Sequence, residues 1–151
     1  MAPDPRPVPR RFPVAPRLSP YVCLAGTARE ALDHYRSVLG GEVTVSTFAE
    51  FGGGGGGADP DGVMHGQLDT PDGFTLMVSD AMPGAAASTG GNVALCLSGD
   101  DAAHLRACFA GLAEGGEVTT PLEVQVWGDE YGALIDRFGV DWMVNVSALP
   151  A

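Results

Sequence analysis

The chain has 151 residues and a formal net charge of −11, with 19 acidic and 8 basic side chains. This length suits one compact domain, and a body this negative repels phosphate backbones, so we expect no nucleic-acid partner. No apolar stretch approaches the length needed to span a bilayer, so we expect no membrane partner either.

The first 17 residues differ from the rest of the chain. They are rich in proline and carry four arginines against one acid, Asp4. Such a segment is extended and cannot pack a core, so we expect residues 1–17 to form a disordered tail. It also lacks the apolar stretch of a secretory signal, and the domain is expected over residues 18–148.

The first half of the domain, module one (residues 18–80), predicts the order strand, helix, strand, strand, strand. Thr27 and Glu30 have the spacing of a capping box, and the helix ends at the glycine pair 40–41. The glycine run Gly52–Gly57 lacks the Gly-Lys-Ser/Thr ending of a phosphate loop, so it is either a flexible insertion or a mobile lid. The predicted elements are 21–25, 27–39, 42–51, 63–69 and 74–79.

A linker rich in Ala, Gly and Pro covers residues 81–90, and module two follows over residues 91–148. Its order is again strand, helix and three strands, and the helix has one apolar stripe. The stripe contains Leu105, Cys108, Phe109 and Leu112. The predicted elements are 92–98, 101–113, 117–126, 131–135 and 142–147.

The two modules are similar in sequence. Residues 23–43 and 96–118 share a Cys-Leu-x-Gly start and a Gly-Gly-Glu-Val end, which aligns Cys23 with Cys96. A tandem repeat of this kind predicts an α+β fold made of two β-α-β-β-β modules. We expect their strands to form one curved mixed sheet around a central cleft, with the helices on the outer face.

Several segments between Leu18 and Ser147 resemble the PhnB-like branch of the vicinal-oxygen-chelate superfamily. This superfamily includes glyoxalases, extradiol dioxygenases and bleomycin resistance proteins. The resemblance implies the tandem-module fold, a ligand in the cleft and a homodimer. The matching segments are 18–21, 31–35, 79–83, 127–132 and 136–146.

The resemblance also implies four inward positions at which metal-dependent members place His, Glu or Gln. In this chain those positions hold Ser19 or Pro20, Met77, Asn92 and Met143. A thioether is a soft ligand and an amide is a weak one, so neither suits a hard divalent cation. We therefore expect no metal and no other cofactor.

The three histidines predict different roles. His65 is the only one on a predicted strand, so it either bonds in the cleft wall or, as an alternative, binds a divalent metal ion together with Glu130. His34 and His104 lie on the flanks of helices and are expected to be solvated.

The chain has three cysteines, at positions 23, 96 and 108, and no Cys-x-x-Cys motif. The residues around each of them in the sequence are mostly apolar. We expect mostly buried free thiols in a reducing compartment, and therefore a cytoplasmic protein.

Polar and aromatic residues on the strands and loops are the candidates for contact with a ligand. Trp127 either lines the cleft beside Tyr131 or fills the core, whereas Trp142 is expected in the core. Polar side chains within apolar strands need partners if they are buried, which makes them natural anchors for a ligand. The candidate ligand-binding residues are His65, Gln67, Gln125, Trp127, Glu130, Tyr131 and Asn145.

Three functions are compatible with these residues. The first is metal-free binding of a small molecule in the cleft between the modules. The second is a metal-dependent lyase, isomerase or dioxygenase with an unusual ligand set around His65. The third is an assembly partner whose cleft is filled by its own side chains. The sequence leaves open whether the protein catalyses a reaction.

Overall fold

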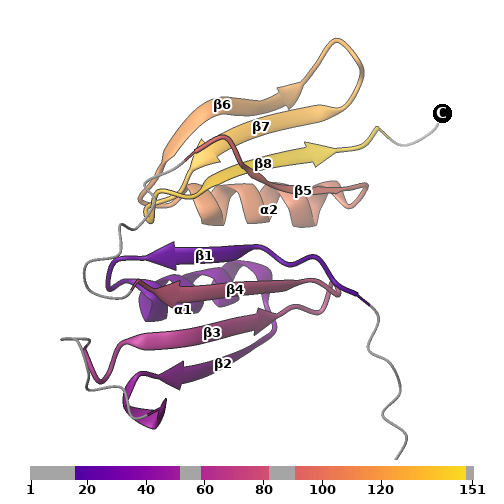
Figure 1. The fold of residues 1–151 in the computed structure, drawn as a ribbon. Helices are drawn as coiled ribbons and strands as arrows, with labels where there is room; N and C mark the ends of the chain where they lie inside the picture. The colour runs from indigo at the N-terminus through magenta and orange to yellow at the C-terminus, as the bar shows by residue number, and fades with distance from the viewer. Residues whose placement is uncertain (1–15, 52–58, 82–90, 149–151) are drawn as a thin grey trace, which may run out of the picture.

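The computed structural model describes residues 16–51, 59–81 and 91–148 (Figure 1). Most of the tail predicted over residues 1–17, the glycine run 52–57 and most of the linker 81–90 therefore lie outside the described residues. Within these ranges, no helix is long and apolar enough to cross a membrane.

Two modules of the same design follow each other along the chain, which confirms the predicted α+β fold with duplicated modules. Module one contains β1 (Tyr21–Leu24), α1 (Ala28–Leu39), β2 (Glu42–Thr47), a short 3-10 helix η1 (Ala49–Phe51), β3 (Val63–Asp69) and β4 (Thr75–Asp80). Module two contains β5 (Leu95–Gly99), α2 (Ala102–Ala113), β6 (Glu117–Val124), β7 (Glu130–Ile135) and β8 (Asp141–Val146).

Each module forms its own four-stranded sheet. The strand orders are β1-β4-β3-β2 and β5-β8-β7-β6. The β1–β4 and β5–β8 pairs are parallel, and the other pairs are antiparallel. No backbone pairing joins the two sheets in the described part of the chain. The structure therefore has two open four-stranded sheets where the sequence predicted one curved sheet.

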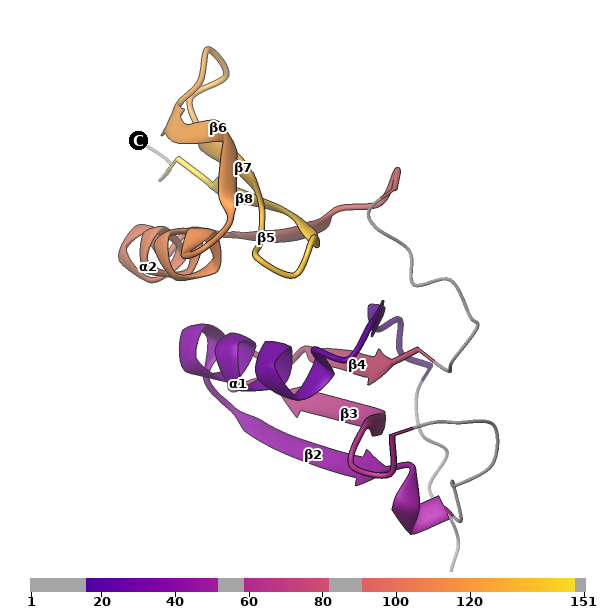
Figure 2. The same ribbon diagram turned by 90° about the vertical axis from the view of Figure 1, so that its left-hand side faces the viewer.

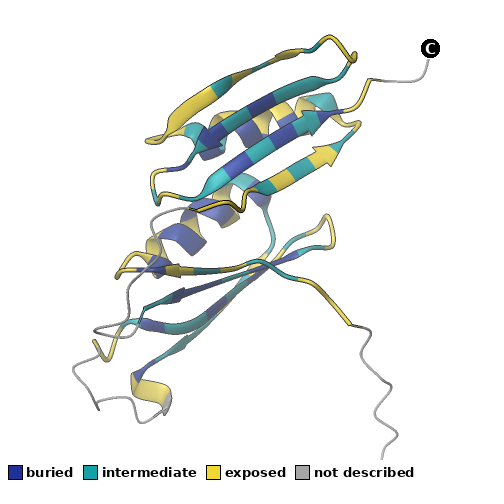
Figure 3. Cartoon of the chain, turned by 45° about the horizontal axis from the view of Figure 1, so that its top comes forward, coloured by how far each residue is buried: buried dark blue, intermediate teal, exposed yellow. Residues whose placement is uncertain are grey.

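The helices pack on one face of their sheets and also contact each other at the module junction (Figure 2). Buried side chains of both modules form one apolar cluster there, including Tyr35, Cys108 and Trp142. We call the opposite face of each sheet its open face, because none of the helices in the described ranges covers it. Residues alternate along several strands between buried and more exposed positions, as Figure 3 shows.

The start of α1 corrects one prediction. Thr27 makes no side-chain capping hydrogen bond, so the expected capping box with Glu30 is absent. Instead, the Asp80 carboxylate of β4 accepts hydrogen bonds of 3.0 Å from the Ala28 N–H and 3.0 Å from the Val63 N–H. A partner distant in sequence thus satisfies the first helical amide, which local spacing does not reveal.

The register of the strands corrects the sequence alignment of the two modules. Met77 of β4 lies opposite Tyr21 of β1, whereas Met143 of β8 lies opposite Cys96 of β5. Tyr21, rather than Cys23, is therefore the counterpart of Cys96 if the two methionines are equivalent. In this register the Cys-Leu pair recurs two residues out of step between the two modules.

Candidate functional site

Two of the predicted residues, His65 and Gln67, lie on the open face of module one. The His65 Nδ1 atom is 3.4 Å from the Tyr21 hydroxyl oxygen, and the two ring centroids are 5.7 Å apart. The Gln67 amide nitrogen lies 3.1 and 3.0 Å from the two carboxylate oxygens of Asp69. Strand alternation in β3 places all three polar side chains on the same face.

A chain of hydrogen bonds extends from Asp69 to the edge of the module. The Thr75 hydroxyl donates to the Asp69 carboxylate over 2.7 Å, and Arg17 donates to the same hydroxyl over 2.6 Å. The bond from Thr75, then the bond from Gln67, lowers the pKa of Asp69 below its ordinary value. This carboxylate is therefore held ionised beside the guanidinium group of Arg17.

Three other predicted residues lie together in module two. Tyr131 and Asn145 are direct partners in the β7–β8 register, and the Trp127 ring centroid is 6.2 Å from that of Tyr131. Trp127 is 58% exposed, so the alternative that placed it in the core is wrong. The Asn145 amide donates over 3.1 Å to Asp129, which helps to fix the loop that carries Trp127.

The remaining two predicted residues lie elsewhere. The Gln125 side chain bonds the backbone carbonyl of Glu123 over 3.0 Å within the β6–β7 hairpin. Glu130 pairs with Arg106 of α2, on the helix-covered side of the second sheet, and this bond lowers the pKa of Glu130. Glu130 and His65 thus belong to different sheets, and the carboxylate of Glu130 is already paired with Arg106.

The four inward positions named in the sequence analysis carry side chains that do not suit a hard divalent cation. Met77 and Met143 lie in the middle of their sheets, with half-buried thioethers. Asn92 is exposed ahead of β5, and Ser19 and Pro20 precede β1. In the described part of the chain, no three His, Cys, Asp or Glu side chains are grouped to hold an ion.

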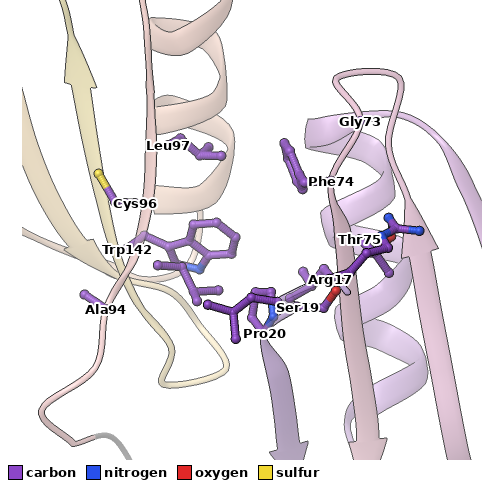
Figure 4. A pocket seen from close by; sticks show the side chains of 13 residues that line it. Arg17, Ser19, Pro20, Gly73, Phe74, Thr75, Ala94, Cys96, Leu97 and Trp142 are labelled. Carbon is purple, nitrogen blue, oxygen red and sulfur yellow. The ribbon is translucent and has the colours of Figure 1, made fainter. Parts of the chain in front are cut away.

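A cavity of about 520 Å³ lies between the modules, and we call it the seam cavity. In Figure 4, Leu97 and Trp142 of module two face Phe74 and Thr75 of module one across it. None of the seven predicted ligand-binding residues lines it. Its walls are Arg17, Leu18, Ser19, Pro20, Gly73, Phe74, Thr75, Leu76, Ala94, Leu95, Cys96, Leu97 and Trp142.

A cleft between the modules was expected from the sequence, but the residues that line the seam cavity were missed, because its walls come from both modules. Trp142 was expected in the core, and it is buried with 3% exposure. Its indole nitrogen donates over 2.9 Å to Asp136, which fixes the ring at the edge of the cavity. Phe74 follows a turn and is half-buried, so no periodic pattern marks it as a cavity wall.

Two predictions about histidines and cysteines need correction. His34 is only 7% exposed, because its side of α1 faces module two, whereas His104 is exposed as predicted and lies 3.1 Å from Asp72 of module one. Cys108 is buried, but Cys23 and Cys96 are exposed because they point to the uncovered sides of the edge strands β1 and β5.

Comparisons with known proteins agree with this architecture. The family model of the glyoxalase/bleomycin resistance protein/dioxygenase superfamily matches residues 17–144. The chain is 31% identical over 147 residues to protein YjdN of Escherichia coli K12, covering 85% of this chain and 94% of that protein. The chain belongs to the glyoxalase/bleomycin resistance protein/dioxygenase superfamily.

Solved structures show the same fold. Protein PA1353 of Pseudomonas aeruginosa superposes with a TM-score of 0.75 at 35% identity, covering 88% of this chain and 98% of that one. The PhnB protein of Bacillus cereus superposes with a TM-score of 0.72 at 20% identity, covering 87% and 100%. The second likeness, at this low identity, shows the shared fold alone.

Proposed function

We propose that this protein binds a small organic molecule in the seam cavity without the help of a metal ion. One observation carries the proposal: a space of about 520 Å³ lies between the modules, and none of the described residues that line it is a histidine or carries a carboxylate. That volume lies in the usual range of small-molecule sites, which are mostly apolar with a few polar groups.

The walls of the seam cavity indicate what kind of molecule it accepts. Phe74, Leu97 and Trp142 supply apolar and aromatic surface, whereas Ser19 and Thr75 supply hydroxyl groups. Arg17 is the one charged residue among the lining residues. A neutral or anionic molecule therefore suits the cavity better than the cation that the acidic body alone would favour.

The metal-dependent alternative has weaker support. It requires His65 to share an ion with a second strong ligand, and Glu130 is paired with Arg106 instead. The assembly-only alternative requires a cleft filled by side chains, and the seam cavity is open. Both alternatives still make distinct experimental predictions.

We also propose that the protein forms a homodimer in the cytoplasm. Apolar side chains at the end of the β6–β7 hairpin are exposed: Val124 by 68%, Val126 by 102% and Trp127 by 58%. The strands β1, β2, β5 and β6 are edge strands, and contact with a second copy is one way to protect such edges. Light scattering coupled to size-exclusion chromatography measures the mass directly.

The binding proposal is tested with three proteins screened against one library of neutral and anionic aromatic compounds. Thermal-shift screening selects ligands of the wild type, and titration then gives their affinities for Leu97→Trp, which fills the cavity, and for His65→Ala, which changes only the open face. We expect Leu97→Trp to lose binding and His65→Ala to change affinity by less than about tenfold (~1.4 kcal/mol). Equal binding by Leu97→Trp would place the ligand elsewhere.

A further inference from the structure

His34 is a buried histidine at the junction of the two modules. It extends from α1, and its ring centroid is 5.9 Å from that of Phe138 in the β7–β8 turn. Only 7% of the residue is exposed, and its Nε2 atom is fully buried without a hydrogen-bond partner. A neutral imidazole tolerates this environment, but a protonated one needs an acceptor at each nitrogen.

Charged groups face His34 from both elements of module two that pack around it. From the β7–β8 turn, Arg137 opposes a positive charge on the imidazole, whereas Asp136 favours one. From the end of α2, Glu114 and the Gly111 carbonyl also favour the charged form. Burial is the largest influence, and the overall effect is to lower the pKa of His34 below 6.5.

The nearby carboxylate of Asp136 cannot easily serve as the missing acceptor. It already accepts hydrogen bonds from the Tyr35 hydroxyl, the Trp142 indole and the backbone N–H groups of Phe138 and Val140. A proton on His34 would therefore add to a packed region a charge that the Gly111 carbonyl favours but that burial and Arg137 together oppose more strongly. That charge would destabilise the contact between α1 and the β7–β8 turn, where His34 packs against Phe138.

We propose that His34 makes the module junction sensitive to acid, so that proton uptake by its imidazole loosens the packing of α1 against module two. The junction is closed while His34 is neutral and opens as it becomes charged. Histidine suits this role because its ordinary titration range lies close to physiological pH.

The direction of the effect follows from the lowered pKa in the folded protein. The unfolded chain takes up the proton at a higher pH than the folded chain does. The stability contributed by neutral His34 is fully present above about pH 6.5, the ordinary histidine value, and is lost as pH falls through the folded pKa. Acid therefore weakens the junction.

An open junction would also disturb the seam cavity. Asp136 links Tyr35 of α1 to Trp142, whose ring forms part of the cavity wall. Loss of ligand binding at low pH is a consequence that rests on the proposed function. Opening of the junction does not rest on it and can be measured without any ligand.

Cys108 supplies a reporter at the same junction. It is 2% exposed, and its sulfur lies 4.0 Å from the Val38 carbonyl oxygen of α1. Changing Cys23 and Cys96 to serine leaves one thiol, and dithiodipyridine labels thiols in acidic as well as neutral buffer. The labelling rate of folded protein is divided by the rate of urea-unfolded protein at each pH, which removes the intrinsic pH dependence of the reaction.

We expect this normalised rate to rise at least about tenfold between pH 7.5 and pH 5 in the two-serine background, through a larger population of the open junction. With His34→Gln added, the rise should disappear, and His34→Leu serves as a second variant if the first folds poorly. With His104→Gln it should persist, because His104 lies 3.8 Å from the same sulfur but is exposed. A rate independent of pH, or an equal rise with both His34 variants, would overturn the proposal.

Discussion

The hydroxyl group of Tyr35 donates a hydrogen bond of 2.5 Å to the carboxylate of Asp136, 101 residues further along the chain. Tyr35 belongs to module one and Asp136 to module two, and both are buried. Burial, followed by the charge of Asp136, raises the pKa of Tyr35 far above its ordinary value. The hydroxyl therefore remains a donor at every physiological pH and ties the modules together.

Replacing Tyr35 by phenylalanine is expected to destabilise the protein by about 1–3 kcal/mol, since a buried carboxylate loses a donor while the ring is kept. Urea unfolding followed by tryptophan fluorescence measures this free energy. Tyr21→Phe is the matched control, because Tyr21 is 50% exposed and its hydroxyl has, among the described residues, one long polar contact, with His65 at 3.4 Å. Equal stability of the two variants would show that the Tyr35–Asp136 bond is dispensable.

Asp80→Ala is expected to cost about 1–2 kcal/mol, because the variant leaves the Ala28 and Val63 amides without their acceptor. Thr27→Ala should change the unfolding free energy much less, since the Thr27 side chain makes no capping bond. Thermal or urea unfolding of the two variants provides the comparison. A larger loss of stability from Thr27→Ala than from Asp80→Ala would show that the Thr27 side chain does cap the helix.

Much of the fold follows from patterns within ten or twenty residues. The strand predicted over 63–69 is β3, and the helix predicted over 101–113 begins one residue later as α2. The strand predicted over 42–51 ends at Thr47, because a bulge at Ser46 and Thr47 precedes the short helix η1. Such a bulge depends on pairing with β3, which local periodicity does not record.

The candidate site was harder to predict, because it depends on contacts between the modules. His65 and Gln67 lie on one face of their sheet because side chains alternate along β3, whereas Tyr131 lies beside Asn145 through the β7–β8 register. The partner of Glu130 is Arg106, 24 residues earlier on a helix, and no spacing rule predicts that pair. The buried position of His34 has the same origin, since the rings around it belong to both modules.

Thiol labelling at neutral pH is expected to distinguish the three cysteines. Cys23 and Cys96 are exposed and should be modified in the folded protein, whereas Cys108 should react only after unfolding. Burial raises the pKa of the Cys108 thiol, and the nearby Asp72 and Asp101 raise it further, so little thiolate is present. Mass spectrometry after brief exposure to iodoacetamide counts the modified sites, and rapid loss of the Cys108 thiol would contradict this structure.

Glu130→Gln is expected to leave the unfolding free energy nearly unchanged, since the partner Arg106 is largely exposed and solvent screens the ion pair. The same variant should leave the affinity for any seam-cavity ligand unchanged, because Glu130 does not line that cavity. Titration calorimetry measures the affinity. A large loss of affinity would instead favour a site that includes Glu130.

Metal-free binding is tested most directly by measuring the metal content of wild-type protein purified without a histidine tag and without chelators. Because the side chains at Met77, Asn92 and Met143 suit hard divalent ions poorly, inductively coupled plasma mass spectrometry should find far less than one ion per chain. One tightly held zinc, nickel, iron or manganese ion per chain, lost together with ligand binding in His65→Ala, would contradict metal-free binding and support a metal-dependent enzyme.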